Sequence, residues 1–415
     1  MRLNTRTTSR AGRLARVAGA LTSLALTASL VFAGPAGAPA ATTTPNGPIS
    51  TQLFSKASPW KADVSALPVD ARSNAYLASM GMDTEVHPDF GTTWNGAPNG
   101  IPYVLVRGTQ PKVPVTFYYP GESDPGPYPI PRNAPVEAGS DHHILVLDTD
   151  NRKLYEVYDA RFNARYGRWD CGSGAVWDLD AMPVRPDGWT SADAAGLPML
   201  PGLVRYDEVA KGEITHALRF TVPRTQAKYV YPALHQASDS ADPALPPMGL
   251  RVRLKRTFDI SGFPKPVQVI FRALKKYGMI VADNGGPWYI SGAPDSRWND
   301  DLLHAITRVK GSDFEVVDTT RIQPAAPVIY SGRAFATRVG GRYVRTSWFA
   351  DPAGKAWNAS VDWGDGTRQV LALTKDKRFR LCHKYTKAGV HYMAIYVRND
   401  KRALGKYWVR VTIAK

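Results

Sequence analysis

Short apolar runs separated by turn-forming residues dominate most of the chain and predict β-strands. Apolar and polar positions alternate along 250–254, as expected for a strand with one buried face. A hairpin is predicted at 143–158, because two strand-like arms flank the turn-forming residues 149–152. The same pattern predicts further strands at 102–107, 113–119, 217–222, 249–255 and 278–282.

Helical periodicity is scarce and is clearest at 266–277, which Gly278 ends. In that segment the apolar residues recur at the spacing of one helix face: Val267, Ile270, Phe271 and Leu274. A second short helix is predicted at 300–308. The pattern therefore predicts a mainly β fold, with a large jelly-roll-like β-sandwich that carries a few short helices.

From about residue 326 the pattern is wholly β and contains Val-Asp-Trp-Gly-Asp-Gly-Thr at 361–367. Gly364 and Gly366 suit a tight turn after a strand, and Trp363 suits a core position. Together with His383, Tyr385, Gly389 and Tyr392, this motif resembles the PKD domain, a small Ig-like β-sandwich found in many extracellular bacterial proteins. The resemblance covers 326–415 and implies a spacer or interaction module, not a catalyst.

The first forty residues have the order of a secretory signal. Five arginines and no acidic residue are followed by an apolar run at 17–33 and by small residues at 34–41. The run is short for a membrane span, although an N-terminal anchor is the alternative. We therefore expect cleavage, a secreted extracellular protein and no membrane span afterwards. Residues 41–79 are interpreted as a leader or linker, and 80–325 as a β-rich body.

The composition describes a globular protein with few cysteines. The chain has 415 residues, 44% of them hydrophobic and 21% charged, a length that suggests two or three domains. Two cysteines exclude a disulfide scaffold and a multi-cysteine zinc site. Since Cys171 and Cys382 fall in different predicted domains, we expect both to be buried and unpaired.

The net charge of +16 is unevenly distributed. Residues 41–325 carry 29 basic and 31 acidic residues, whereas 326–415 carry 18 basic and 5 acidic ones. Six of the basic residues cluster: Lys375, Lys377, Arg378, Arg380, Lys384 and Lys387. The cluster is either a solvated face or a binding site for an anionic cell-wall polymer or acidic polysaccharide. Nucleic acid is not expected as a partner of a secreted chain.

Motifs for familiar chemistry are absent from the body. It has no G-x-S-x-G elbow, no H-E-x-x-H and no P-loop. The adjacent residues His142 and His143 would point to opposite sides of a strand, so they do not indicate a shared metal. We predict no cofactor and no metal site.

Carboxylates and aromatic residues in the body form a pattern typical of sugar binding, in which rings stack on pyranose faces and polar groups bind hydroxyls. The catalytic candidates are Asp207, Glu208 and Asp283, with His216 as an acid or base. The ligand-binding candidates are Trp177, Trp189, Arg205, Tyr206, Asn284, Trp288 and Trp298. If this interpretation holds, Asp207, Glu208, Asp283 and Trp288 line one groove.

Several stretches between 80 and 320, including 202–209 and 273–285, resemble a family of secreted bacterial proteins of no established activity. The resemblance supports a domain boundary but implies no mechanism. The sequence predicts a secreted carbohydrate-associated protein, with a glycan-binding body and a basic PKD-like module that docks on a cell wall or matrix. The alternatives are a glycoside hydrolase or polysaccharide lyase, and a structural surface protein without a ligand. Enzyme status stays open.

Overall fold

A computed structural model describes residues 43–415 except 181–182, 184, 325, 333 and 402. The predicted signal segment therefore lies outside the described residues. The chain is mainly β with few short helices, as the sequence predicts. The buried apolar residues of the described chain gather in several separate clusters.

A five-stranded sheet opens the body. Its strands lie in the order β1 (Thr44–Pro45), β5 (Tyr103–Val106), β7 (Ile144–Asp148), β8 (Lys153–Tyr158) and β11 (Ser173–Asp178). The predicted hairpin is confirmed, because β7 and β8 pair from Ile144–Val157 to Asp148–Lys153. A smaller sheet lies in the order β6 (Val115–Phe117), β10 (Arg168–Cys171) and β9 (Arg161–Asn163).

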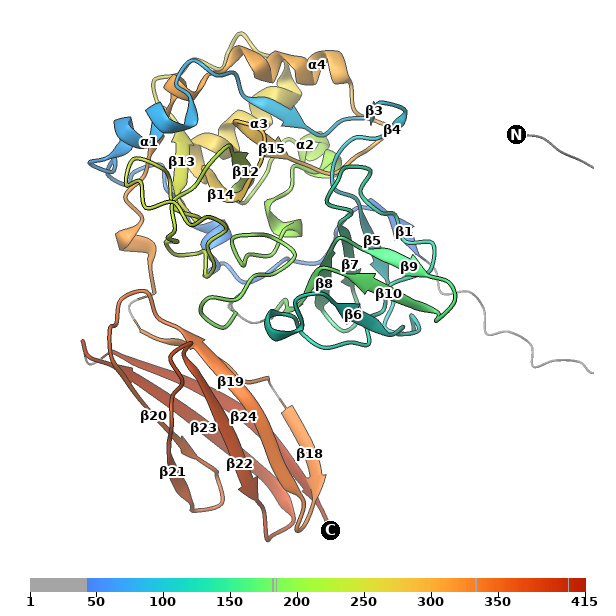
Figure 1. The fold of residues 1–415 in the computed structure, drawn as a ribbon, viewed down its shortest axis with the longest axis vertical. Helices are drawn as coiled ribbons and strands as arrows, with labels where there is room; N and C mark the ends of the chain where they lie inside the picture. The colour runs from blue at the N-terminus through green and yellow to red at the C-terminus, as the bar shows by residue number, and fades with distance from the viewer. Residues whose placement is uncertain (1–42, 181–182, 184, 325, 333, 402) are drawn as a thin grey trace, which may run out of the picture. The chain divides into compact units, whose positions relative to one another are not determined.

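A six-stranded mixed sheet forms the rest of the body. Its order is β16 (Phe314–Val316), β13 (Arg251–Leu254), β14 (Met279–Asn284), β12 (Leu218–Val222), β15 (Tyr289–Ser291) and β2 (His87–Asp89). Helix α3 (Lys265–Lys276) connects β13 to β14 (Figure 1), and its predicted apolar face is fully buried. The other helices are α1 (Ser73–Met80), α2 (Tyr206–Lys211) and α4 (Asp300–His304).

The segment interpreted as a leader or linker contributes to the body instead. Strand β1 pairs with β5, and Trp60 is 1% exposed in the same apolar cluster as Tyr76 and Leu77 of α1. Turn residues and prolines in 43–60 hide this packing in the sequence, because they break both strand and helix periodicity.

The C-terminal module is a two-sheet β-sandwich. One sheet has the order β17 (Val328–Tyr330), β19 (Arg342–Ala350) and β22 (Arg378–Lys384). The other has the order β18 (Ala334–Arg338), β24 (Leu404–Ala414), β23 (Gly389–Asn399), β20 (Trp357–Asp362) and β21 (Arg368–Leu371). Figure 1 shows these long strands running side by side. All buried residues of the module's main apolar cluster lie between Ile329 and Ile413.

The Gly-Asp-Gly turn of the module has a steric requirement. Gly364 has φ +75°, and a Cβ at this position would lie 2.6 Å from the backbone oxygen of Tyr392. Trp363 is 1% exposed, as expected for a core anchor. The motif therefore brings the turn against β23, where a larger residue does not fit.

Both cysteines are free. Cys171 is buried, as expected, but Cys382 is exposed. Cys382 lies on the outward side of β22, where side chains alternate between core and surface. No helix in the described part of the chain is long and apolar enough to cross a membrane.

Candidate functional site

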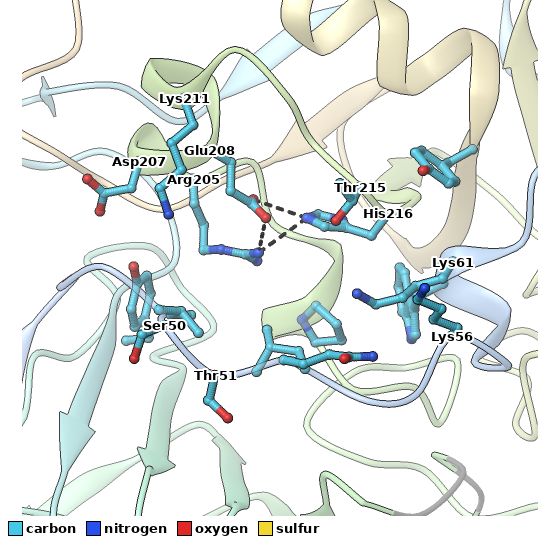
Figure 2. A pocket seen from close by; sticks show the side chains of 17 residues that line it. Ser50, Thr51, Lys56, Lys61, Arg205, Asp207, Glu208, Lys211, Thr215 and His216 are labelled. Atoms are coloured by element: carbon cyan, nitrogen blue, oxygen red, sulfur yellow. Dashed lines mark hydrogen bonds and ion pairs between the residues drawn. The ribbon is translucent and has the colours of Figure 1, made fainter.

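A pocket of about 570 Å³ lies in the body beside α2 (Figure 2). Its walls come from the segment 49–61, from strand β5, from α2 with the residue before it, and from the segment that leads into β12. The polar and charged side chains that line it are Ser50, Thr51, Gln52, Lys56, Lys61, Arg205, Asp207, Glu208, Lys211, Thr215 and His216.

Arg205, Glu208 and His216 form a hydrogen-bonded cluster in the pocket wall. Glu208 Oε1 accepts from Arg205 Nη2 at 2.6 Å, and Glu208 Oε2 lies 3.1 Å from His216 Nε2. Arg205 Nη1 donates to the Leu200 carbonyl at 2.8 Å, and His216 Nδ1 donates to the Ala217 carbonyl at 2.8 Å. Burial favours the neutral carboxyl, but Arg205 and His216 outweigh it and lower the pKa of Glu208 to about 2.

The charge balance of the pocket is positive. Lys56, Lys61, Arg205 and Lys211 line it, against the two carboxylates of Asp207 and Glu208. Both carboxylates already have cationic partners, since Arg205 binds Glu208 and Arg297 binds Asp207 at 3.0 Å. Burial lowers the pKa of the Lys61 ammonium, because a partly buried cation loses part of its hydration. An anionic group entering the pocket would relieve this cost.

Asp207 and Tyr206 both contact Arg297 and stabilise the local fold. Arg297 bridges Asp207 to Asp295, which its guanidinium binds at 2.6 Å. The same guanidinium lies 4.2 Å from the centre of the Tyr206 ring, whose edge packs against Trp298. Asp207 lines the pocket as an ion-paired carboxylate, and Tyr206 is covered on one face.

The predicted tryptophan platforms are wrong for three of the four residues. Trp288 is 0% exposed, stacked between Phe220 and Phe314. Trp177 is 3% exposed and Trp298 6% exposed, and both indole N–H groups donate to buried acceptors. These rings fill the apolar core and cannot present a face to a sugar. Trp189 is half-buried, with the Arg185 guanidinium 5.5 Å from its ring centre.

The predicted groove is not formed either. The pocket contains Asp207, Glu208 and His216, whereas Asp283, Asn284 and Trp288 are not among its lining residues. Asp283 and Asn284 end strand β14, and Asn284 accepts from Thr225 Oγ1 at 2.9 Å. Asp207 and Glu208 belong to α2, whereas Asp283 and Asn284 lie at the end of β14.

Asp283 belongs to a second charged cluster, which sequence reasoning missed. Buried Asp193 pairs with Arg219 of β12 at 3.3 Å, and Arg219 also donates to Ser291 Oγ at 2.6 Å. Nearby His143 Nδ1 lies 2.6 Å from Glu137, and its Nε2 lies 3.0 Å from the Ala192 carbonyl. Two acceptors require two N–H groups, so His143 is an imidazolium.

The electrostatics of this second cluster are strongly perturbed. Burial, with the neighbouring charge of Asp193, raises the pKa of Asp283 to about 7. Burial opposes the charge on His143, but Glu137 outweighs it and raises the pKa of His143. The cluster therefore holds one carboxyl that changes protonation near neutral pH.

The basic cluster of the module is only partly exposed. Arg380 and Lys384 point outward and are exposed, as are Lys375 and Lys387 on the adjoining loops. Lys377 is half-buried over the Trp357 ring, and half-buried Arg378 lies 3.7 Å from Asp376. Arg342 of β19 pairs across the strands with Lys384 and extends the exposed basic surface.

Sequence reasoning missed the lysines of the pocket. Lys56 and Lys61 lie in the segment interpreted as a linker, and Lys211 ends α2. The spacing of three residues between Arg205, Glu208 and Lys211 in the sequence indicates a charged helix face. In the described part of the chain, no group of three or more His, Cys, Asp or Glu residues is placed to hold a metal ion.

Comparison with known proteins finds likeness to solved structures over part of the chain. No protein-family model matches the sequence, and no curated protein matches it. The PKD domain of an M14-like peptidase from Thermoplasmatales archaeon SCGC AB-540-F20 is 18% identical over 22% of this chain and 94% of that one, with a TM-score of 0.18.

Two further PKD domains are similar to the same extent. The PKD1 domain of Vibrio anguillarum Epp is 18% identical over 21% of this chain and 94% of its own, with a TM-score of 0.17. The PKD domain of the human VPS10 domain-containing receptor SorCS2 is 19% identical over 22% of this chain and 75% of its own, with a TM-score of 0.18. These likenesses concern the fold of about a fifth of the chain and carry no argument about function.

Proposed function

We propose that this chain is an exported glycan-binding protein whose body takes an acidic sugar unit in the pocket beside α2. The observation that carries the proposal is the charge of that pocket. Four cationic side chains line it, and both of its carboxylates are already bound by arginines. The surplus positive charge favours a ligand that carries a carboxylate or a similar anionic group.

The other lining groups suit a hydroxyl-rich ligand. Ser50, Thr51, Gln52 and Thr215 offer hydroxyl and amide groups, and Tyr103 and Tyr277 contribute rings. A volume of about 570 Å³ lies within the range of small-molecule sites, roughly 300–1,000 Å³. A pocket of this size accommodates one or two sugar rings.

Isothermal titration with glucuronate, galacturonate, glucose and inorganic phosphate tests this proposal. We expect the uronates to bind, glucose to bind at least tenfold more weakly, and Lys61→Met to lose most of the uronate affinity. Lys112→Met is the matched control, because Lys112 is an exposed lysine outside the pocket. Equal affinity for glucose and glucuronate would contradict the proposal, as would binding of phosphate alone.

The basic surface of the module supports a docking role on an anionic wall polymer. Arg380, Lys384 and Arg342 share one outward sheet face, and Lys375 and Lys387 are exposed nearby. Adsorption to anionic cell walls should fall when Arg380 and Lys384 are both replaced by Gln, and it should weaken steeply with salt. Lys401→Gln is the control. Adsorption that is indifferent to salt and to the double variant would remove this role.

The hydrolase or lyase alternative is favoured by a different observation. Asp283 has a pKa of about 7 and lies in the cluster with Asp193 and Arg219, as a general acid or base requires. A degradation screen on polygalacturonate, hyaluronate and chitosan, comparing the wild type with Asp283→Asn, tests it. Products that the wild type forms and the variant does not would support the enzyme. If the wild type neither forms products nor binds a ligand, the chain is a structural surface protein.

A further inference from the structure

The module exposes an aromatic row on the sheet opposite to its basic cluster. In strands β23 and β24, Tyr392 is 59% exposed and Trp408 58% exposed. Met393 and Val409, the next residues along the two strands, are buried. Since side chains alternate along a strand, Tyr392 and Trp408 point outward from the five-stranded sheet. Large exposed rings on a rigid sheet commonly mark an interaction surface.

The strand register fixes how these rings lie relative to one another. Trp408 pairs with Ala394, which stands two residues from Tyr392 on one side and two residues from Tyr396 on the other. Trp408 is therefore a diagonal neighbour of both tyrosines, about 7–8 Å from each between backbones, whereas Tyr392 and Tyr396 lie about 13 Å apart along the same strand. Ala394 itself is 2% exposed, so the larger side chains around it cover it. The three aromatic residues therefore alternate between the two strands on one outward face of the sheet.

Cationic side chains alternate with these rings. Tyr392 pairs with Arg410, and Tyr396 pairs with Lys406, whose ammonium lies 5.9 Å from the Tyr396 ring centre. Within the described part of the chain, neither Arg410 nor Lys406 has a carboxylate at ion-pair distance. Asp362, which faces the same side, is held by Arg368 at 2.9 Å. The charge on this face is positive and available to a ligand.

We propose that this face, formed by Tyr392, Tyr396, Lys406, Trp408 and Arg410, binds a linear acidic polysaccharide. The rings stack on the flat C–H faces of successive sugars, and Arg410 and Lys406 pair with their carboxylates. A repeating polymer matches a row in which apolar and cationic groups alternate. An apolar protein segment fits less well, because the cations interrupt the aromatic surface.

This face is separate from the pocket and from the basic cluster on β22. Lys61 in the body and Arg380 on the three-stranded sheet mark those two surfaces. Variants at these positions therefore separate the three proposals. The face needs no ligand in the pocket and would hold the polymer on its own.

Affinity electrophoresis of the full chain in gels that contain polygalacturonate tests the proposal, with hydroxyethylcellulose as the neutral polymer and gelatin as the protein. We expect Trp408→Ala to weaken polygalacturonate binding about tenfold or more, and Arg410→Gln to weaken it and reduce its salt dependence. Trp94→Ala removes a tryptophan that is 70% exposed in the body and should change nothing. Thermal unfolding checks that each variant is folded, and Trp408→Phe should retain part of the binding.

Three results would overturn the proposal. The first is wild-type affinity for polygalacturonate in folded Trp408→Ala. The second is binding that is lost in Lys61→Met or Arg380→Gln but kept in Trp408→Ala, which would assign the polymer to the pocket or to the basic cluster. The third is retardation by gelatin alone, which would assign the face to a protein partner.

Discussion

The Glu208 carboxylate lies 2.6 Å from the Arg205 guanidinium in the wall of the pocket. Their pairing, with His216 on the other carboxylate oxygen, keeps Glu208 ionised and unable to act as a general acid at neutral pH. The pair instead builds the pocket wall, and it leaves the lysines as the groups that an anionic ligand would meet.

Glu208 should make stability depend on acid pH. Its pKa is about 2 in the folded chain, below the ordinary value of roughly 4.3 for an unfolded glutamate. The stabilisation, about 3 kcal/mol, is therefore complete above pH 5 and disappears as the pH falls toward 2. Urea unfolding of the wild type and Glu208→Gln across this window measures it. A difference between the two proteins that does not shrink at low pH would contradict the assignment.

Asp283 should make folding stability depend on pH in the opposite direction. Its pKa of about 7 exceeds the unfolded value of roughly 3.9, so its contribution is fully present below pH 4 and is lost as the pH rises to 7. We expect the melting temperature of the wild type to fall relative to Asp283→Asn between these limits. A carbon-13 titration of the Asp283 carboxyl should show its midpoint near 7. In Asp193→Asn that midpoint should move down, because the Asp193 charge helps to raise it.

Trp288 should be a stability residue and not a binding residue. It is fully buried, and its indole N–H donates to the Gly81 carbonyl at 2.9 Å. Trp288→Ala should cost about 3–5 kcal/mol of unfolding free energy, whereas Trp288→Phe should cost less. Any uronate bound by the folded fraction should keep its wild-type affinity. A stable Trp288→Ala with selectively lost affinity would restore the ring to a ligand site.

The Gly-Asp-Gly turn of the module offers a matched pair of substitutions. A Cβ at Gly364 would meet the backbone of Tyr392, whereas a Cβ at Gly366 has open space around it. Both residues have positive φ, so both alanine variants are strained by about 1–2 kcal/mol. Gly364→Ala should lose about 2 kcal/mol more than Gly366→Ala because of the clash. Differential scanning calorimetry of the two variants decides this, and equal losses would show that the contact with β23 is unimportant.

Local patterns in the sequence predicted the elements well. The hairpin of β7 and β8 follows from the turn residues between two apolar arms, and α3 follows from its single apolar face. These features depend on neighbours within a few residues of each other, so they can be read without knowing the tertiary fold.

The site depended on long-range packing and could not be predicted to the same extent. Lys61 lines the pocket because residues 43–79 pack against the body. Trp288 is not available to a ligand, because Phe220 and Phe314 stack on its ring. An aromatic residue beside a carboxylate occurs both in cores and in sugar sites. Only burial distinguishes the two, and burial is set by chain segments far apart in sequence.

The apolar cluster of the module draws its buried side chains only from Ile329 to Ile413. The apolar packing that stabilises this sandwich is therefore encoded in one continuous segment, and exchanging that segment would leave the residues of the body's main apolar cluster unchanged. Fused to an unrelated enzyme, the same segment should keep its exposed basic and aromatic faces.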